Sequence, residues 1–254
     1  MLKIDLTGKL AVITGASGQL GRVMARTLAD CGADIAVHYN SNKTKAEELV
    51  KLISDMGRRT AAFQADVTDR NAIKAMHDAI ADQLGNPDIV VCNAVIQYDW
   101  TSVLDQNIED YYSQFESCVM HNVYMAKEFI PAMKEKHYGR FIAINTECSA
   151  LAEPNCSAYT SAKKGLDGFI RVLAKEVGEY GITVNQVAPG WTISERDREN
   201  NSEVQLEYDK TVPLKRRGTD AEIAQMVAFL ASDLASFTTG AYIPVSGGRV
   251  MPAI

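Results

Sequence analysis

The chain has 254 residues, 46% of them hydrophobic and 23% charged, with a formal net charge of −6. This length suits a single large α/β domain, and the composition is that of an ordinary globular protein. The acidic balance argues against a nucleic-acid-binding protein, which would need a basic face. No apolar run approaches the ~18 residues of a membrane span, and the start carries no signal-peptide core, so we expect a cytoplasmic protein.

Short apolar runs alternate with longer stretches of helical period along the chain. Most of these runs are continuously apolar, as expected of strands that are covered on both faces. The expected strands are 10–14, 34–38, 60–65, 89–92, 141–145, 183–188 and 242–245. The expected helices are 19–30, 43–56, 70–84, 107–136, 157–179 and 220–231. Alternating strands and helices imply right-handed crossovers and a parallel sheet.

Residues 191–218 show neither pattern, being charged and only weakly apolar. Long irregular stretches in compact domains are usually functional loops, so we expect a partly helical substrate lid here. The five cysteines and four histidines show no metal-ligand spacing. We therefore expect no metal site, and cysteines that are small buried side chains in a reducing compartment.

The first expected strand leads into Thr14-Gly-Ala-Ser-Gly-Gln-Leu-Gly21, and a helix follows. Glycines let a backbone approach a pyrophosphate closely, and a helix N-terminus supplies N–H donors and a positive dipole end. The placement of this turn after the first strand of a βαβ unit predicts a dinucleotide site. Its expected contacts are Gly15, Ser17, Gln19 and Leu20.

Tyr159 and Lys163 are four residues apart, so on a helix they lie one turn apart on one face. A free tyrosine has a pKa of about 10, and a positive charge within ~4–6 Å lowers that pKa. The pair could therefore act as an acid and base near neutral pH. Tyr39 and Lys43 have the same spacing without any chemical context, so the pattern gains meaning only beside a hydride carrier.

Taken together, the landmarks of this chain resemble the short-chain dehydrogenase/reductase family almost end to end. They are Thr14-Gly…Gly21, Asp66-Val67, Cys92-Asn-Ala94, Tyr159…Lys163, Val184-Asn-Gln-Val-Ala-Pro-Gly190 and Thr239-Gly…Val245-Ser-Gly-Gly248. The resemblance implies a single-domain, Rossmann-type doubly wound α/β fold over 1–254, with a seven-stranded, mostly parallel sheet. It also implies an oxidoreductase that interconverts a ketone and a secondary alcohol, and a homotetramer. The chain is most similar to 3-oxoacyl thioester reductases, with sugar or polyol dehydrogenases as the alternative.

The resemblance also implies catalytic roles. Tyr159 would be the general acid and base, and Lys163 would lower its pKa and hold the nicotinamide ribose. Thr146 stands where relatives carry a serine, and it keeps the hydroxyl donor. Cys118 stands where relatives carry an asparagine that anchors a water linked to the lysine. Either other groups rebuild this relay, or activity has narrowed or been lost, which would leave a non-catalytic nucleotide-binding protein.

For the cofactor, the resemblance assigns the adenine, the ribose and the nicotinamide to separate groups of residues. The assigned residues are Asp66 and Val67, then Asn93 and Ala94, then Pro189, Gly190, Thr192 and Ser194. The second strand ends in His38-Tyr-Asn-Ser-Asn-Lys43 without the acidic residue that selects NAD. Asn40 and Ser41 could accept a 2′-phosphate, which predicts NADP(H) rather than NAD(H). Gly18 argues the other way, because NADP-dependent relatives often carry a basic residue there.

We expect the substrate pocket to be lined by Gln97, Tyr98, Glu147 and Trp191. This mixture of aromatic and acidic side chains favours a polar or amphiphilic small molecule. The sequence shows no obvious basic patch of the kind that would dock an acidic acyl-carrier protein.

Overall fold

The continuously apolar segments form the centre of the fold, because a strand that is buried on both faces needs no polar side. In the computed structural model, which describes residues 3–252, seven strands form one sheet in the order β3-β2-β1-β4-β5-β6-β9. All six pairings are parallel. The strands are β1 Leu10–Ile13, β2 Asp34–Tyr39, β3 Thr60–Gln64, β4 Ile89–Cys92, β5 Gly139–Ile144, β6 Ile182–Pro189 and β9 Tyr242–Val245. The predicted doubly wound α/β fold is confirmed.

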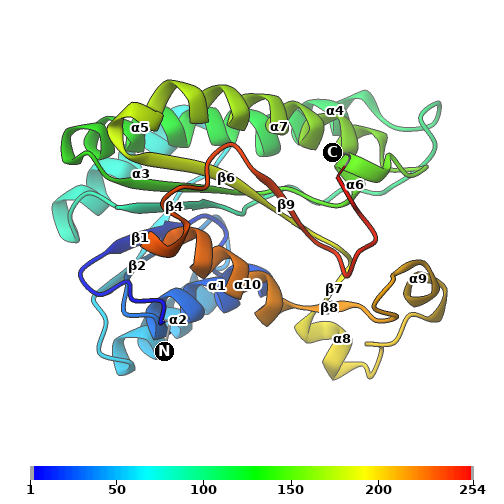
Figure 1. Ribbon diagram of the computed structural model, residues 1–254, viewed down its shortest axis with the longest axis horizontal. Coiled ribbons are helices and arrows are strands. Elements are labelled where there is room, and N and C mark those ends of the chain that lie inside the picture. The colour runs from blue at the N-terminus through cyan, green and yellow to red at the C-terminus, as the bar shows by residue number, and fades with distance from the viewer. Residues whose placement is uncertain (1–2, 253–254) are drawn as a thin grey trace.

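Two layers of helices cover the sheet (Figure 1). One layer packs against one face of the sheet and shares a hydrophobic core with it. This layer consists of α1 Gln19–Asp30, α2 Lys43–Asp55 and α10 Asp220–Ala231. The other face packs against α3 Arg70–Gln83, α5 His121–Lys136 and α7 Ser157–Val177. α4 Ile108–Phe115 precedes α5, and the short α6 Cys148–Leu151 follows β5.

The helix expected over 107–136 is not continuous. A π-helical turn, η1 Glu116–Met120, separates α4 from α5. Side chains take up carbonyl groups in this region: Ser117 Oγ donates to Ser113 O, and Asn122 Nδ2 donates to Cys118 O. Side-chain bonds of this kind compete with the regular helix ladder, and π turns inside helices occur frequently at functional sites.

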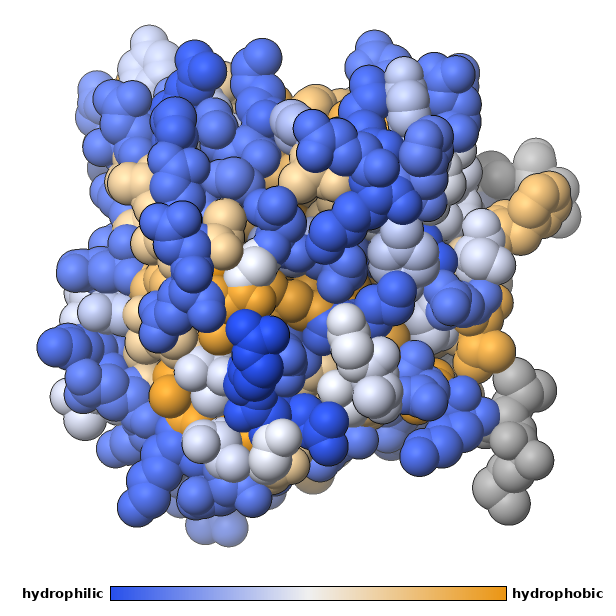
Figure 2. Space-filling view, turned by 90° about the vertical axis from the view of Figure 1, so that its left-hand side faces the viewer, coloured by the Kyte–Doolittle hydropathy of each residue, from blue (hydrophilic) through white to orange (hydrophobic). Residues whose placement is uncertain are grey.

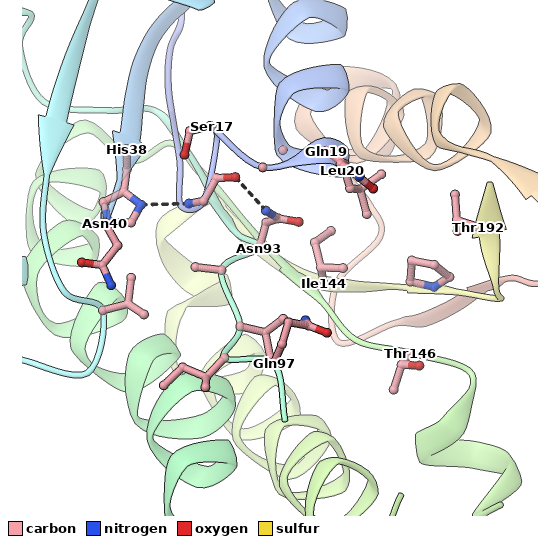
Figure 3. Close-up of a pocket in the computed structure, with 18 of the residues that line it drawn as sticks. Ser17, Gln19, Leu20, His38, Asn40, Asn93, Gln97, Ile144, Thr146 and Thr192 are labelled. Atoms are coloured by element: carbon pink, nitrogen blue, oxygen red, sulfur yellow. Dashed lines mark hydrogen bonds between the residues drawn. The ribbon is translucent and has the colours of Figure 1, made fainter. Parts of the chain in front are cut away.

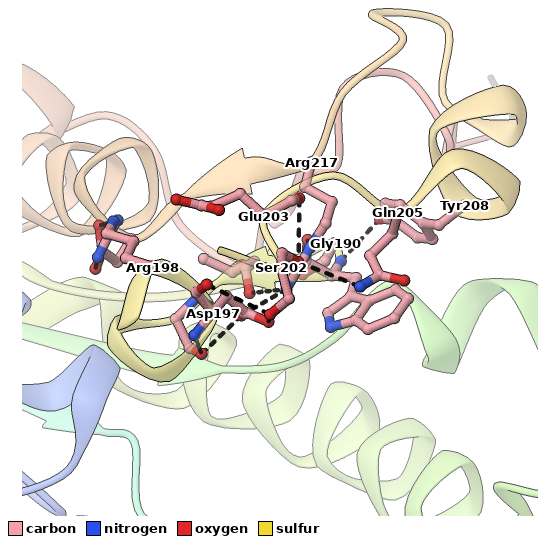
Figure 4. A network of polar contacts seen from close by, with 12 residues as sticks. Gly190, Asp197, Arg198, Ser202, Glu203, Gln205, Tyr208 and Arg217 are labelled. Carbon is pink, nitrogen blue, oxygen red and sulfur yellow. Dashed lines mark hydrogen bonds and ion pairs between the residues drawn. The ribbon is translucent and has the colours of Figure 1, made fainter. Parts of the chain in front are cut away.

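The irregular stretch after β6 is partly helical, as the sequence indicates. It contains the two-stranded pair β7 Thr192–Ile193 and β8 Gly218–Thr219, with α8 Glu195–Glu199 and α9 Leu206–Thr211 between them. The buried Arg217 side chain organises it, donating to Asp197 Oδ2 at 2.9 Å and to the Thr192 carbonyl at 2.9 Å (Figure 4).

β7, β8 and α9 lie together at one end of the molecule, past the carboxyl end of β6 (Figure 1). The side away from them is covered largely by hydrophilic residues, between which apolar side chains show (Figure 2). Between residues 3 and 252, no helix combines the length and apolar character needed to cross a bilayer.

Candidate active site

The carboxyl ends of four neighbouring strands are joined by hydrogen bonds. The backbone N–H of Gly15 donates to His38 Nδ1 at 2.8 Å, so the proton of this ring lies on Nε2, which faces the Ala65 carbonyl at 3.0 Å. On the other side, Asn93 Nδ2 donates to the Thr14 carbonyl at 3.0 Å. Figure 3 shows His38 and Asn93 on either side of the turn after β1. These contacts hold the loops after β3, β2, β1 and β4 in register.

The turn after β1 fits a dinucleotide pyrophosphate. Gly15 has φ +65°, which favours glycine, and a Cβ at Gly21 would lie 2.2 Å from the Gly15 carbonyl oxygen. Helix α1 begins at Gln19, and its N-cap is Gly18, which has no side chain to occupy the first N–H groups. Those donors and the positive end of the helix dipole therefore face the turn.

A cavity of about 580 Å³ runs from this turn to Tyr159. The sequence-predicted residues that line it are Gly15, Ser17, Gln19, Leu20, Asn40, Ser41, Asp66, Val67, Asn93, Ala94, Gln97, Thr146, Tyr159, Lys163, Pro189, Gly190, Trp191 and Thr192. Ser194 is not among them, because its hydroxyl and backbone form a capping box with Asp197 at the start of α8. The predicted nicotinamide contact at Ser194 therefore has no support from this geometry.

Tyr159, Lys163 and Thr146 meet where this cavity approaches the end of β5. Lys163 is 4% exposed, and its Nζ donates to the Ile144 carbonyl at 2.6 Å while lying 5.6 Å from the centre of the Tyr159 ring. Thr146 Oγ1 accepts from the Cys148 N–H at 3.2 Å, which leaves its own proton available to a substrate oxygen. The Tyr242 hydroxyl donates to the Thr146 carbonyl at 2.7 Å and fixes this residue.

The pKa of Tyr159 is raised, whereas the sequence predicts that Lys163 lowers it. Burial of the phenol is the largest cause, the neighbouring thiols of Cys118 and Cys148 add to it, and the Thr146 hydroxyl opposes it. Lys163 directs its ammonium group to a main-chain carbonyl. In this state of the protein the phenol therefore keeps its proton well past neutral pH.

Cys118 lies in the π turn η1 and is 1% exposed. Among residues 3–252, Cys118 lines neither the cavity that begins at the glycine turn nor a second cavity that adjoins it. Its thiol has only a weak partner, Gln114 Oε1 at 3.9 Å, and its carbonyl accepts from the Asn122 amide. The chain thus places a poor hydrogen-bonding group at the position where the family resemblance implies an asparagine.

A second cavity of about 560 Å³ adjoins the first at Thr146, Tyr159 and Gly190. It contains all four predicted substrate residues, which are Gln97, Tyr98, Glu147 and Trp191. It is also lined by Tyr208 and Arg249, which the sequence analysis did not single out. Tyr208 lies within the expected lid 191–218 and Arg249 directly follows the landmark Val245-Ser-Gly-Gly248, so both positions carried a signal.

Known proteins resemble this chain along nearly all of its length. A family model described as "Enoyl-(Acyl carrier protein) reductase" matches residues 15–249. The chain is 35% identical over 253 residues to the 3-oxoacyl-[acyl-carrier-protein] reductase FabG of Staphylococcus aureus, covering 96% of this chain and 98% of that protein. It is 34% identical over 249 residues to FabG of Pseudomonas aeruginosa, covering 98% and 100%. The chain belongs to the short-chain dehydrogenase/reductase family.

Solved structures agree with this assignment. One, provisionally described as a gluconate dehydrogenase from Agrobacterium tumefaciens, superposes with a TM-score of 0.92 over 100% of both chains at 27% identity. The promiscuous reductase LugOII superposes with a TM-score of 0.89 at 30% identity, covering 97% of this chain and 99% of that chain. Family membership makes the protein an oxidoreductase and implies a nicotinamide cofactor, which the glycine turn fits.

Two buried histidines are further features that the sequence motifs did not reveal. His38 and His121 are 1% and 0% exposed, and burial lowers their pKa values to about 4 and about 3. Both rings are therefore neutral at neutral pH, as the hydrogen bond from Gly15 to His38 requires. Continuous apolar neighbours along the second strand are the one signal that could have indicated a buried ring at His38.

These shifts predict that the folded state loses stability in mild acid. Below pH 6.5 the unfolded chain takes up protons at both rings while the folded chain does not, so the free energy of unfolding is largest above pH 6.5 and falls toward pH 4. At ~1.4 kcal/mol per pH unit, each ring contributes a loss of about 2 kcal/mol between pH 6.5 and 5. Urea unfolding at pH 7, 6 and 5 measures this loss of unfolding free energy.

The variant His38→Asn should remove roughly half of this pH dependence, since an amide offers a donor and an acceptor but does not titrate in this range. Replacement of the exposed His137 by Asn is the matched control and should leave the pH dependence unchanged. Equal slopes for His38→Asn and the unaltered protein would contradict the assignment.

Proposed function

We propose that this protein is an NADP(H)-dependent oxidoreductase that interconverts a ketone and a secondary alcohol. One observation carries the proposal. Tyr159 and Thr146 stand at the junction of two cavities, one that begins at the glycine turn and one that has no dinucleotide features. A substrate oxygen at that junction would be within reach of an acid and of a hydroxyl donor.

The nicotinamide, when bound, would supply or accept the hydride. This chain's residues would manage the oxygen: Tyr159 donates a proton to it during reduction, and Thr146 donates a hydrogen bond to the same atom. Lys163, held by the Ile144 carbonyl, would keep a positive charge beside the phenol and bind the nicotinamide ribose. Burial raises the pKa of Tyr159, so the phenol carries the proton that it would donate to the substrate oxygen in the reduction direction.

The Tyr159→Phe variant should reduce turnover by about 10²–10⁴-fold, because the general acid is removed while the ring is kept. NADPH binding, followed by nucleotide fluorescence, should be nearly unchanged. Oxoacyl thioesters, keto-sugars and simple ketones form the panel on which turnover is measured. If the unaltered protein binds NADPH and turns over no member of the panel, the protein is a non-catalytic nucleotide-binding member of its family. Turnover that is unchanged in Tyr159→Phe would refute Tyr159 as the general acid.

We propose NADP(H) over NAD(H) because the end of β2 offers only neutral polar groups to the cavity. Asn40 and Ser41 line it, and no aspartate or glutamate is present among residues 38–43. An acidic residue there would repel a 2′-phosphate, and its absence permits one. Replacing Asn40 by Asp should weaken NADPH binding by at least about 10-fold and NADH binding much less. A preference of the unaltered protein for NADH would refute the assignment.

Cys118 is proposed as the weak member of the catalytic group. Cys118→Asn would supply an amide donor and acceptor in the π turn, and turnover should rise if the proton supply to Lys163 limits it. The pH dependence of kcat separates this from a change in folding, because only altered proton supply shifts it. No change in kcat or in its pH profile would mean that other groups already compensate for the thiol.

Two substrate classes remain open at this level. The FabG relatives are named for 3-oxoacyl thioesters, and a structural neighbour is provisionally described as a gluconate dehydrogenase. We also propose a cytoplasmic homotetramer. Exposed apolar side chains on two helices support self-association, which light scattering would measure. They are Ile108, Tyr112 and Phe115 on α4, and Val172 on α7.

A further inference from the structure

Helix α7, which carries Tyr159 and Lys163, begins without a side-chain cap of its own. Its N-cap residue is Cys156, whose side chain makes no capping hydrogen bond to the first turn. The Cys156 thiol donates instead to the Glu153 carbonyl at 3.1 Å and lies 3.2 Å from the Thr160 hydroxyl oxygen. An N-cap side chain normally accepts from the N–H two or three residues into the helix. The N–H groups of this first turn therefore need acceptors from elsewhere.

A tyrosine from a distant loop supplies such an acceptor to the catalytic residue itself. Tyr159 is the third residue of α7, and its N–H donates to the Tyr98 hydroxyl oxygen at 3.0 Å. Tyr98 belongs to the irregular segment after β4 and lines the substrate cavity. Burial raises the pKa of Tyr98, so the acceptor is a neutral phenol at neutral pH. Tyr98 thus takes the place of an N-cap side chain from 61 residues earlier in the chain.

The loop that carries Tyr98 is fixed on both sides of this residue by buried glutamines. Gln114 Nε2 donates to the Ile96 carbonyl at 2.9 Å, and Gln106 Nε2 donates to the Asp99 carbonyl at 3.1 Å. Gln114 and Gln106 are only 0% and 7% exposed. Because the main chain is held before and after Tyr98, its hydroxyl is presented to α7 from a defined position.

The same loop also contacts the ring of Tyr159. The Trp100 ring lies 5.9 Å from the Tyr159 ring, centre to centre, at an interplanar angle of 32°. The ring of Tyr98 lies 6.4 Å from that of Trp100. Aromatic rings at such separations attract one another. The loop after β4 therefore holds Tyr159 at two points, which are its main-chain N–H and its ring.

We propose that Tyr98 is a positioning residue for the reaction, which fixes the first turn of α7 by accepting the Tyr159 N–H and thereby places the phenol that donates the proton. The inference rests on the proposed function of Tyr159 as the general acid and adds a residue to it. Tyr98 acts through the main chain of Tyr159 and exchanges no proton with the substrate. A misplacement of about 1 Å at reacting groups can cost ~10²-fold in rate, so the effect belongs in kcat rather than in binding.

The Tyr98→Phe variant tests this, because it keeps the ring beside Trp100 and removes only the accepting oxygen. On the ketone of the panel that the unaltered protein reduces fastest, kcat should fall about 10-fold. KM for that ketone and the Kd of NADPH should stay within about 2-fold. Tyr111→Phe is the matched control, since the Tyr111 hydroxyl lies 2.7 Å from Ser157 Oγ in the same helical turn without contacting the Tyr159 N–H. It should keep kcat. An equal loss in both variants, or no loss in Tyr98→Phe, would overturn the inference.

Combining Tyr98→Phe with Tyr159→Phe separates positioning from general damage to the fold. If Tyr98 acts through the Tyr159 phenol, its substitution should cause no further loss of kcat once that phenol is absent. A further loss of about 10-fold would contradict the inference. If Tyr159→Phe alone keeps full turnover, the proposed role of Tyr159 fails and the inference with it. If Tyr159→Phe loses turnover and Tyr98→Phe does not, only the inference fails.

Hydrogen exchange, resolved to single amides, tests the same contact in the unaltered protein. The Tyr159 and Ser157 amides both belong to the first turn of α7, and both residues are partly buried. Tyr159 has an acceptor in Tyr98, so its amide should exchange at least about 10-fold more slowly than that of Ser157. Equal exchange rates would show that the Tyr98 cap does not form in solution and would end the proposal.

Discussion

The hydrogen-bonded row along the carboxyl edge of the sheet is the constraint on which the rest of the site depends. It runs from the Ala65 carbonyl through the His38 ring to the Gly15 N–H, and then from the Thr14 carbonyl to the Asn93 amide. Parallel strands bring their carboxyl ends to one edge but leave the loops beyond them free. The row removes that freedom, so the glycine turn keeps one conformation.

A second row continues this order toward the chemistry. Asn145 Nδ2 donates to the Lys163 carbonyl at 3.1 Å and lies close to Gln186 Oε1, which joins α7 and β6 to the end of β5. Lys163 returns a bond to Ile144. Tyr159, one turn away on α7, is therefore tied to the sheet through this row, and its own N–H ties it to the loop after β4 by donating to the Tyr98 hydroxyl at 3.0 Å. This is the preorganisation that acid–base chemistry requires.

The sequence could specify the sheet because two-sided burial leaves an unbroken apolar run at most strands, as in β4 Ile89–Cys92. It could also locate Tyr159, from its four-residue spacing to Lys163, and it could locate Thr146 and much of the cofactor cavity, because these residues follow strands. It could not indicate the π turn, which depends on side-chain bonds from Ser117 and Asn122 that compete with the helix ladder. Nor could it reveal the Glu147–Arg249 pair, whose members are about a hundred residues apart and meet only through the fold.

Cys118 and the ion pair of Glu147 with Arg249 both bear on Tyr159, in different ways. The thiol offers little hydrogen bonding behind the phenol, and burial raises the pKa of Tyr159. Glu147 and Arg249 order the space in front of it. Binding energy that is gained away from the reacting carbon can offset an orientation cost at it, so a pocket wall fixed by this ion pair bears on the chemistry at Tyr159 without itself holding the transferred proton.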